Sequence, residues 1–239
     1  MGTNDARTWS ETWRTAYRHK RPRWGFILRR VARHIALENL DVLELGAGEG
    51  NLSYHTLCAG ARRVALVDFS QEALNRARPL FSGWPTDKVS FVEANLLEVD
   101  LGRQFDLVMS SGVVEHFAGD DLARCIERHA VHSRRYVAVC IPADTPFNRM
   151  RARDPHTHAL FGFWQTIPDE MIAGSIRDQG FDIRVCERFR CSYGVPLFQI
   201  KGTRRVQQWL HRLVFDFLLA PILPRRWGGL LLVIGERRR

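Results

Sequence analysis

DVLELGAGEGN, residues 41–51, is an apolar run that meets three glycines at alternate positions. The run at 41–45 predicts a buried strand, and the residues from 51 to 59 predict a helix that follows it. Glycine lets the backbone turn tightly and approach a ligand closely. In an open parallel sheet, such a turn lies at the carboxyl ends of the strands, where ligands bind. An ordinary strand-to-helix turn rarely needs three glycines, so the stretch favours a ligand-binding α/β fold.

Strands and helices alternate along the rest of the chain. Further strands are expected at 63–67, 89–93, 105–109, 136–141, 181–189 and 230–235. Helices are expected from 70 to about 81, from 120 or 121 to about 132, from 168 to 179, and within 206–219. This order predicts an α/β protein with a Rossmann-like, mostly parallel seven-stranded sheet and helices on both faces.

The net charge of +9 is concentrated at the two ends of the chain. Residues 1–40 contain nine basic and three acidic side chains, and residues 201–239 contain nine and two. Basic ends can bind phosphate, a carboxylate substrate, nucleic acid or an anionic membrane. They can equally reflect an arginine-rich composition, because the chain has only three lysines.

The cysteines and the apolar runs indicate the compartment. None of the five cysteines forms a Cys-x-x-Cys pair, so a disulfide framework or a zinc site is not expected. Reduced thiols are typical of a cytoplasmic protein. The N-terminus lacks the apolar run of a signal peptide, and the stretch 213–223 is too short to span a bilayer. We expect a cytoplasmic protein, with contact at the inner membrane surface through 209–219 as an alternative.

Two residues at the glycine turn separate two classes of cofactor. The nicotinamide and flavin fingerprint, Gly-x-Gly-x-x-Gly, would need a glycine where Asn51 stands. Glu44 lies directly before the turn, where a carboxylate suits a positively charged amino group and not a pyrophosphate. The residues themselves therefore argue against a dehydrogenase.

Four segments together resemble the successive motifs of class I S-adenosylmethionine-dependent methyltransferases. They are VLELGAGEGNLS (42–53), VALVDFS (64–70), FVEANLLEVD (91–100) and FDLVMSSGVVEHF (105–117). Their order and spacing match the family over roughly residues 40–190, with a closing strand at 230–236. The resemblance implies the methyltransferase fold, S-adenosylmethionine as cofactor and methyl transfer as the activity.

The resemblance also implies a single domain that covers residues 1–239. Its expected parts are an N-terminal helical cap at 1–38, a cofactor-binding core at 39–190, a helical insertion at 195–228, and the last strand with a basic tail at 229–239. Gly/Ser-rich linkers and internal repeats are absent from the sequence, which agrees with one domain.

The resemblance assigns cofactor-binding roles to residues in each motif. The methionine moiety would lie against Glu44 and the turn formed by Gly46, Ala47, Gly48 and Gly50. Asp68 would accept hydrogen bonds from both ribose hydroxyls, as a carboxylate can. The adenine ring and the reactive methyl would be bounded by Phe69, Asn95, Leu96 and Ser111. Asn95 departs from the family pattern, in which an aspartate is commonest at this position.

Candidates for catalysis and substrate binding come from three places. His116 is a candidate general base, although Glu-His here can also shape the loop. Asp144, His156 and His158 form a second polar group after the fifth strand; we expect them to bind substrate and to hold no metal. Tyr17 follows Trp9 and Trp13 at a spacing of four, so all three share one helical face and would cover the site.

The expected function is methyl transfer to oxygen, nitrogen or carbon of a small, possibly anionic or amphipathic molecule. The alternatives are a macromolecular substrate, RNA or protein, reached through the basic ends; a lipid-linked substrate at a membrane; and a non-catalytic Rossmann-like module. DNA is not an expected partner, because the chain lacks the Asn/Asp-Pro-Pro-Tyr/Phe motif that DNA and RNA amino-methyltransferases often carry. The sequence does not decide the oligomeric state.

Overall fold

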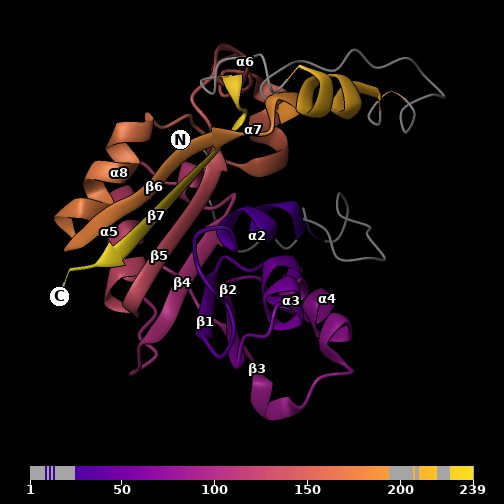
Figure 1. Cartoon of the computed structure of the whole chain (residues 1–239). Coiled ribbons are helices and arrows are strands. Elements are labelled where there is room, and N and C mark those ends of the chain that lie inside the picture. Colours follow the sequence, from indigo (N-terminus) through magenta and orange to yellow (C-terminus); the bar gives the residue numbers. More distant parts are fainter. Residues whose placement is uncertain are drawn as a thin grey trace.

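One seven-stranded sheet organises the computed structural model, which describes residues 9, 11, 13, 25–193, 207, 210–219 and 227–238. The strand order is β3-β2-β1-β4-β5-β7-β6 (Figure 1). The strands are β1 (Asp41–Leu45), β2 (Arg63–Asp68), β3 (Val89–Glu93), β4 (Phe105–Ser111), β5 (Ser133–Pro142), β6 (Phe181–Phe189) and β7 (Leu230–Arg237). Neighbours among β1–β5 pair in parallel, whereas β7 is antiparallel to both β5 and β6. The mostly parallel seven-stranded sheet is confirmed.

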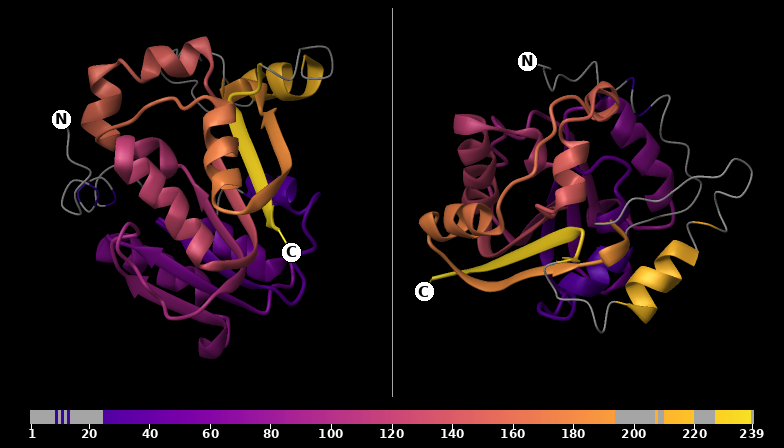
Figure 2. Two further views of the ribbon diagram at one scale, coloured as in Figure 1. Left: turned by 90° about the vertical axis from the view of Figure 1, so that its left-hand side faces the viewer. Right: turned by 90° about the horizontal axis from the view of Figure 1, so that it is seen from above.

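Helices cover both faces of this sheet, as Figure 2 shows from two further directions. They are α2 (Gly25–Val31), α3 (Asn51–Cys58), α4 (Gln71–Ala77), α5 (Gly119–Val131), α6 (Pro146–Arg151), α7 (Pro155–Phe161) and α8 (Asp169–Asp178). Short helical turns are η1 (Arg78–Phe81), η2 (Thr86–Lys88), η3 (Val114–His116), η4 (Cys191–Tyr193) and the π-helical η5 (Leu213–Leu218). None of these helices, within the described residues, is long and apolar enough to cross a membrane.

Two separate apolar clusters hold the layers together. One packs side chains of α5 and α8, such as Ile126 and Ile172, against one face of the sheet. The other packs α2, α3 and α4, through residues such as Leu28, Leu57 and Leu74, against the opposite face. Strands buried on both faces read as continuous apolar runs, and β1 is buried at all five positions.

Several element boundaries differ from the expected ones for local reasons. The helix after Ser70 is capped as predicted, since the Ser70 hydroxyl accepts from the Ala73 amide, but it ends at Ala77 and continues as a 3-10 turn. Pro79 lacks the amide hydrogen that a continuing α-helix needs there. Strand β4 extends through Ser111, so that residue lies in the strand and not after it.

The connection between β5 and α8 contains two helices that the sequence pattern does not predict. Both α6 and α7 begin with a proline, and the side chains of Thr145 and Asp154 accept backbone hydrogen bonds at their N-termini. They lie beyond the carboxyl end of β5 (Figures 1 and 2). Much of the expected insertion at 195–228 falls outside the described residues; 210–218 are helical, in agreement with the expected pattern.

Candidate active site

The sheet has its switch point between β1 and β4, where the strand order reverses direction. Ligands of open α/β sheets bind at such a point, outside the carboxyl ends of the strands. A cavity of about 720 Å³ lies there. Its size is within the range of small-molecule sites, roughly 300–1,000 Å³.

The glycine turn after β1 forms the floor of this cavity. Gly46 and Gly48 have positive φ angles of 66° and 53°, which side chains rarely adopt. A Cβ atom on Gly46 would lie 2.5 Å from a methyl group of Val113, and one on Gly48 would lie 2.6 Å from the Trp13 ring. The turn therefore brings bare backbone to the cavity, as the sequence predicts.

Residues predicted to hold the cofactor converge on this one cavity. Those that line it are Glu44, Gly46, Ala47, Gly48, Asp68, Phe69, Asn95, Leu96 and Ser111. Gly50 does not line it. Instead Gly50, with a φ of 69°, packs below the turn, where a Cβ would lie 2.7 Å from Leu66.

Two buried carboxyl groups give this end of the cavity its acidic character. One oxygen of Glu44 accepts hydrogen bonds from the Ser53 amide at 2.9 Å and from the Ser53 hydroxyl at 2.5 Å. Asp68 accepts from the Gly48 amide at 2.8 Å and from the Ser70 amide at 2.9 Å. Burial raises the pKa of Glu44 to about 7 and that of Asp68 to about 6. A cation bound here would favour the ionised form of both groups.

Asn95 lies on the exposed rim of the cavity. Its amide oxygen accepts from the Leu97 amide at 3.1 Å, which forms a local turn. The side-chain oxygen keeps a second lone pair, and the amide nitrogen remains a donor.

His116 is buried and faces the segment before α8. Its Nδ1 donates to the carbonyl oxygen of Phe163 at 2.7 Å, and the Trp9 ring meets its ring edge-on at a centroid distance of 5.0 Å. Burial lowers the pKa of His116 to about 4, although nearby carbonyl oxygens act in the opposite direction. An imidazole with this pKa is a weak base near neutral pH. Its catalytic role stays a prediction.

Further hydrogen bonds join the same two segments. The Gln165 amide donates to the Glu115 carbonyl at 3.0 Å, and the Gln165 side chain donates to the Phe117 carbonyl at 2.5 Å. Together with the His116 bond, they tie residues 115–117 to residues 163–165; we call this set of contacts the clasp. It holds the aromatic side chains of 161–164 over the cavity.

Glu115 is a site residue that the sequence reasoning missed. Its carboxyl group is buried against the Trp164 side chain, and one of its oxygens has no hydrogen-bond partner. Burial raises the pKa of Glu115 to about 8. Other missed lining residues are Arg151, Phe161, Phe163, Trp164 and Tyr193. No motif in the sequence marks them, because residues 143–193 carry none of the family segments.

The expected second polar group is not part of the cavity. Asp144 pairs with Arg149 at 2.5 Å, and His158 lies between the carbonyl oxygens of Ala152, at 2.7 Å, and Gly162, at 3.1 Å. Neither these residues nor His156 line the cavity. Within the described part of the chain, no group of three His, Cys, Asp or Glu side chains could hold a metal.

The aromatic cover is described only in part. Trp9 and Trp13 line the cavity, in agreement with the expected cover. Tyr17, the third residue of that helical face, lies outside the described residues.

Comparison with known proteins matches part of the chain to methyltransferases. Residues 42–134 match a family model described as a methyltransferase domain. Over 73 residues the chain is 33% identical to the histone-arginine methyltransferase CARMER of Anopheles gambiae, which aligns 30% of this chain and 12% of that protein. Over 68 residues it is 35% identical to ribosomal RNA small subunit methyltransferase A of Cereibacter sphaeroides, which aligns 28% and 24%. The chain thus matches a quarter or less of the length of these relatives.

Solved structures resemble the chain over nearly its whole length. The magnesium protoporphyrin IX methyltransferase of Synechocystis PCC 6803, with bound S-adenosylhomocysteine, superposes with a TM-score of 0.63 at 16% identity and covers 97% of this chain and 94% of its own. A putative methyltransferase in complex with the Haloferax volcanii activator Trm112 gives a TM-score of 0.66 at 16% identity, with 100% and 98% covered. At such identities the likeness shows the fold alone.

Proposed function

Because the core of this chain belongs to the class I S-adenosylmethionine-dependent methyltransferase family, we propose that it binds S-adenosylmethionine in the cavity and methylates a small-molecule acceptor. One observation carries this proposal. The bare glycine turn, buried Glu44 and buried Asp68 line a single cavity at the switch point of the sheet.

The residues at this end of the cavity fit the cofactor. Gly46 and Gly48 leave no room for side chains, so the backbone itself would face the methionine moiety. Glu44 would face the amino group, and the free lone pairs of Asp68 would accept from the ribose. Phe69, Asn95 and Leu96 would bound the adenine ring, with Ser111 beside the reactive end. Burial raises the pKa of both Glu44 and Asp68, and the positively charged cofactor would favour their ionised forms.

The chemistry needs little acid catalysis from the protein. When bound, the cofactor supplies a methyl group on a positively charged sulfur that becomes neutral on transfer. The contribution of the chain is to align the acceptor and to exclude water, and such alignment can lower a barrier by ~7–11 kcal/mol at best. Trp9 and Trp13 cover the cofactor end, and the clasp fixes the acceptor end.

We propose that His116 acts chiefly by holding Phe163 in place. A base works best when its pKa lies near the working pH, and the pKa of about 4 for His116 is far below it. Proton removal by the second ring nitrogen is the alternative. The pH profile of the methylation rate distinguishes the two roles. If the profile follows a single ionisation of the acceptor and is the same in His116→Asn, His116 has the positioning role. If His116→Asn loses the acidic limb of the profile, His116 is the base.

Binding of the cofactor is the first test. Calorimetry on the folded protein is expected to detect S-adenosylmethionine and S-adenosylhomocysteine, and no binding of NADH. Glu44→Gln should weaken both, whereas the exposed Glu98→Gln should not. If neither S-adenosylmethionine nor S-adenosylhomocysteine gave heat with the folded protein, the proposed enzyme function would fail.

A macromolecular acceptor is the second candidate, favoured by the match to an rRNA methyltransferase and by the basic ends. Transfer of a labelled methyl group to total RNA would support it if the binding also fell steeply with added salt. Label that stays in the small-molecule fraction would support the leading proposal, which the aromatic residues lining the cavity also favour.

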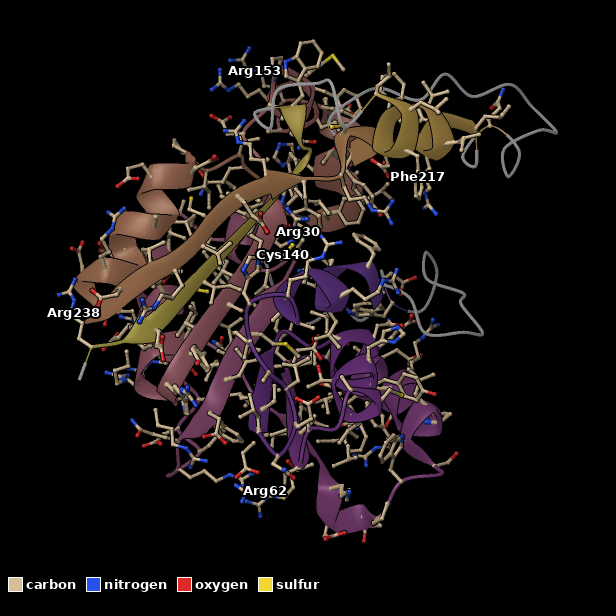
Figure 3. All side chains as sticks on the ribbon, in the orientation of Figure 1. Arg30, Arg62, Cys140, Arg153, Phe217 and Arg238 are labelled. Atoms are coloured by element: carbon tan, nitrogen blue, oxygen red, sulfur yellow. The ribbon has the colours of Figure 1, made fainter. Side chains whose placement is uncertain are left out.

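We also propose that the protein works in the cytoplasm, which its five free thiols support. Contact with the inner membrane surface is a further proposal, supported by the exposed apolar side chains of Leu218 and of Phe217, which Figure 3 labels, on the helix at 210–218. Flotation with anionic vesicles would test it.

A further inference from the structure

One buried carboxyl group of the cavity lies outside the set proposed to hold the cofactor. Glu115 lines the cavity and is 2% exposed. Within the described residues, its Oε2 atom has no hydrogen-bond partner. A buried polar atom without a partner costs free energy, and such atoms are uncommon in folded proteins. Glu115 therefore offers a hydrogen-bonding position that a ligand can fill.

This carboxyl group lies near the ends of two strands. A Cβ atom on Gly112 would be 3.6 Å from Glu115 Oε1, and Gly112 directly follows Ser111 at the end of β4. Burial, and next the charge of Glu115, raise the pKa of the thiol of Cys140, which lies near the end of β5 and is labelled in Figure 3. Glu115 is thus beside the place proposed for the reactive end of the cofactor.

One hydrogen bond already orients the carboxyl group. The Trp164 side chain donates to it, through the ring N–H that is the only donor of an indole. Trp164 is buried and belongs to the segment that the clasp fixes. The carboxyl group of a glutamate can turn about its last bond. Either oxygen can therefore take the indole N–H while the other one faces a ligand.

The groups around Glu115 leave it able to accept a proton near neutral pH. Burial raises its pKa to about 8, and the charge of Arg151 on α6 acts in the opposite direction. The thiols of Cys125 on α5 and Cys140 on β5 have pKa values raised by burial and by Glu115, so both stay neutral. Burial lowers the pKa of His116 to about 4, so that ring is neutral as well. A base works best when its pKa lies near the working pH.

The walls of the acceptor end are aromatic. They contain Phe117, Phe161, Phe163, Trp164 and Tyr193. Aromatic rings stack on flat partners and attract cations to their faces. Walls of this kind with one buried acid suit a flat apolar molecule that carries an amine.

We propose that the methyl acceptor is an amine on a flat apolar body, and that its nitrogen donates a hydrogen bond to the unpaired oxygen of Glu115. This inference rests on the proposed function and names the substrate class of the same site. An ammonium ion must lose one proton before its nitrogen can attack the methyl group. That proton passes to the Glu115 carboxylate, the nitrogen–carbon bond forms, and the electron pair of the broken carbon–sulfur bond stays on sulfur. The positive charge of the bound cofactor favours this loss of a proton.

Proton release on binding tests the contact with Glu115. At pH 7 the carboxyl group of the free protein is mostly protonated, and a free amine is an ammonium ion. Their hydrogen-bonded pair holds one proton fewer, so binding should release about one proton. The amine 2-naphthylmethylamine is titrated calorimetrically into the full chain saturated with S-adenosylhomocysteine, so that no turnover occurs. Two buffers with different heats of ionisation give the number of protons released, and the Kd should fall by about tenfold between pH 6 and pH 7.

Two further flat probes of similar size separate an amine from other acceptors. The probe 2-naphthylmethanol keeps a hydrogen-bond donor without a charge, and 2-ethylnaphthalene has neither. At pH 8 we expect the amine to bind about tenfold or more tightly than either, since a hydrogen bond to a charged group is worth at least that much. Only the amine should release a proton.

Two variants assign the proton to Glu115. Glu115→Gln keeps the size of the side chain but has no proton to give up, so the release should vanish and the advantage over the alcohol should be lost. Glu115→Asp keeps the acid and should still release a proton. The matched control is Glu98→Gln, which is exposed, lies outside the cavity and should behave as the wild type.

The outcomes separate this inference from the proposed function. If S-adenosylhomocysteine fails to bind the wild type, the proposed function itself fails. If it binds but the amine gives no heat, releases no proton, has no advantage over the alcohol, or still releases a proton in Glu115→Gln, the amine acceptor is overturned. Unchanged affinity of Glu115→Gln for S-adenosylhomocysteine shows that the variant is folded. If that affinity is lost, Glu115→Asp and the pH dependence of the wild type decide.

Discussion

At the scale of single residues, Asp68 combines a structural and a binding position. Its two oxygens each accept a backbone hydrogen bond, from Gly48 and from Ser70, and so connect the glycine turn to the start of α4. The Phe69 amide is a third backbone donor to this carboxylate, which leaves about one of its four lone-pair sites for a ligand. The sequence motif predicts that Asp68 is a cofactor-binding acid, but it does not predict the hydrogen bond from the Gly48 amide to its carboxylate.

Asp68→Asn is expected to weaken the binding of S-adenosylmethionine by about tenfold or more. The amide would point one NH2 group at a backbone N–H, so either the turn or α4 would lose its acceptor. Calorimetric Kd values measure the effect. Asp100→Asn is the matched control, because Asp100 accepts the Gly102 amide at 2.8 Å in an exposed loop outside the cavity. Equal Kd values for wild type and Asp68→Asn would contradict the assignment.

The buried acids predict how the stability of the ligand-free protein depends on pH. Burial raises the pKa of Glu44 to about 7 and that of Glu115 to about 8, both from 4.5. Above pH 4.5 the folded state therefore keeps protons that the unfolded chain loses, so stability falls as the pH rises toward 8. His116 and His129, lowered to about 4 from 6.5, act in the opposite direction, but only below pH 6.5.

We expect the free energy of unfolding of the ligand-free protein to fall between pH 6.5 and 8.5. Glu115→Gln should make that fall shallower, because the neutral amide removes the group with the highest of these pKa values. Urea unfolding at a series of pH values measures the slopes, with Glu98→Gln as an exposed control. Identical slopes for wild type and Glu115→Gln would show that Glu115 is not protonated in the folded state.

At the scale of elements, the sequence predicts what depends on local pattern. The bounds of β1, β3 and β6 agree with the expected ones. Strand β1 is buried at every position, whereas β3 is half-buried and β6 alternates apolar with polar residues, and both patterns are typical of strands between turn residues. The clasp was not predictable in this way. Its partners are separated by 47 and 48 residues, and it uses backbone carbonyls that any residue supplies. The expectation that His156 and His158 bind substrate follows from their position after the fifth strand. In the structure both histidines lie on α7, and neither lines the cavity.

Gln165→Ala tests the clasp as an element. It removes one side-chain hydrogen bond to the Phe117 carbonyl, which should cost about 1 kcal/mol of stability. Amide hydrogen exchange at residues 163–165 should rise, and the Kd for S-adenosylhomocysteine should stay the same. The control is Gln71→Ala, which removes an exposed side-chain bond to Asn75 in α4. Protection of 163–165 as strong as in the wild type would mean that the clasp does not hold this segment.

At the scale of the whole molecule, the cavity is assembled from parts that are distant in the sequence. The carboxyl ends of β1 to β5 contribute the glycine turn and the residues at 68–69, 94–97, 111–113 and 140–142. The parallel sheet explains their convergence, because it places strand ends side by side. Further lining comes from the N-terminal tryptophans and from residues 151, 161, 163 and 164. These belong to additions to the sheet, where the sequence carries no readable motif.

The N-terminal contact predicts that a tryptophan outside the sheet controls retention of the cofactor. The Trp13 ring covers the glycine turn so closely that a Cβ on Gly48 would lie 2.6 Å from it. Trp13→Ala should therefore raise the dissociation rate of S-adenosylhomocysteine by about tenfold, the effect of losing part of a large apolar contact. Its effect on the thermal stability of the ligand-free protein should be small, because the main clusters are built from α2 onward and contain no part of Trp13.

The control is Trp227→Ala, since that side chain is 50% exposed and lies outside the cavity. Stopped-flow tryptophan fluorescence gives the rates; equal dissociation from wild type and Trp13→Ala would show that the cover plays no part in holding the cofactor.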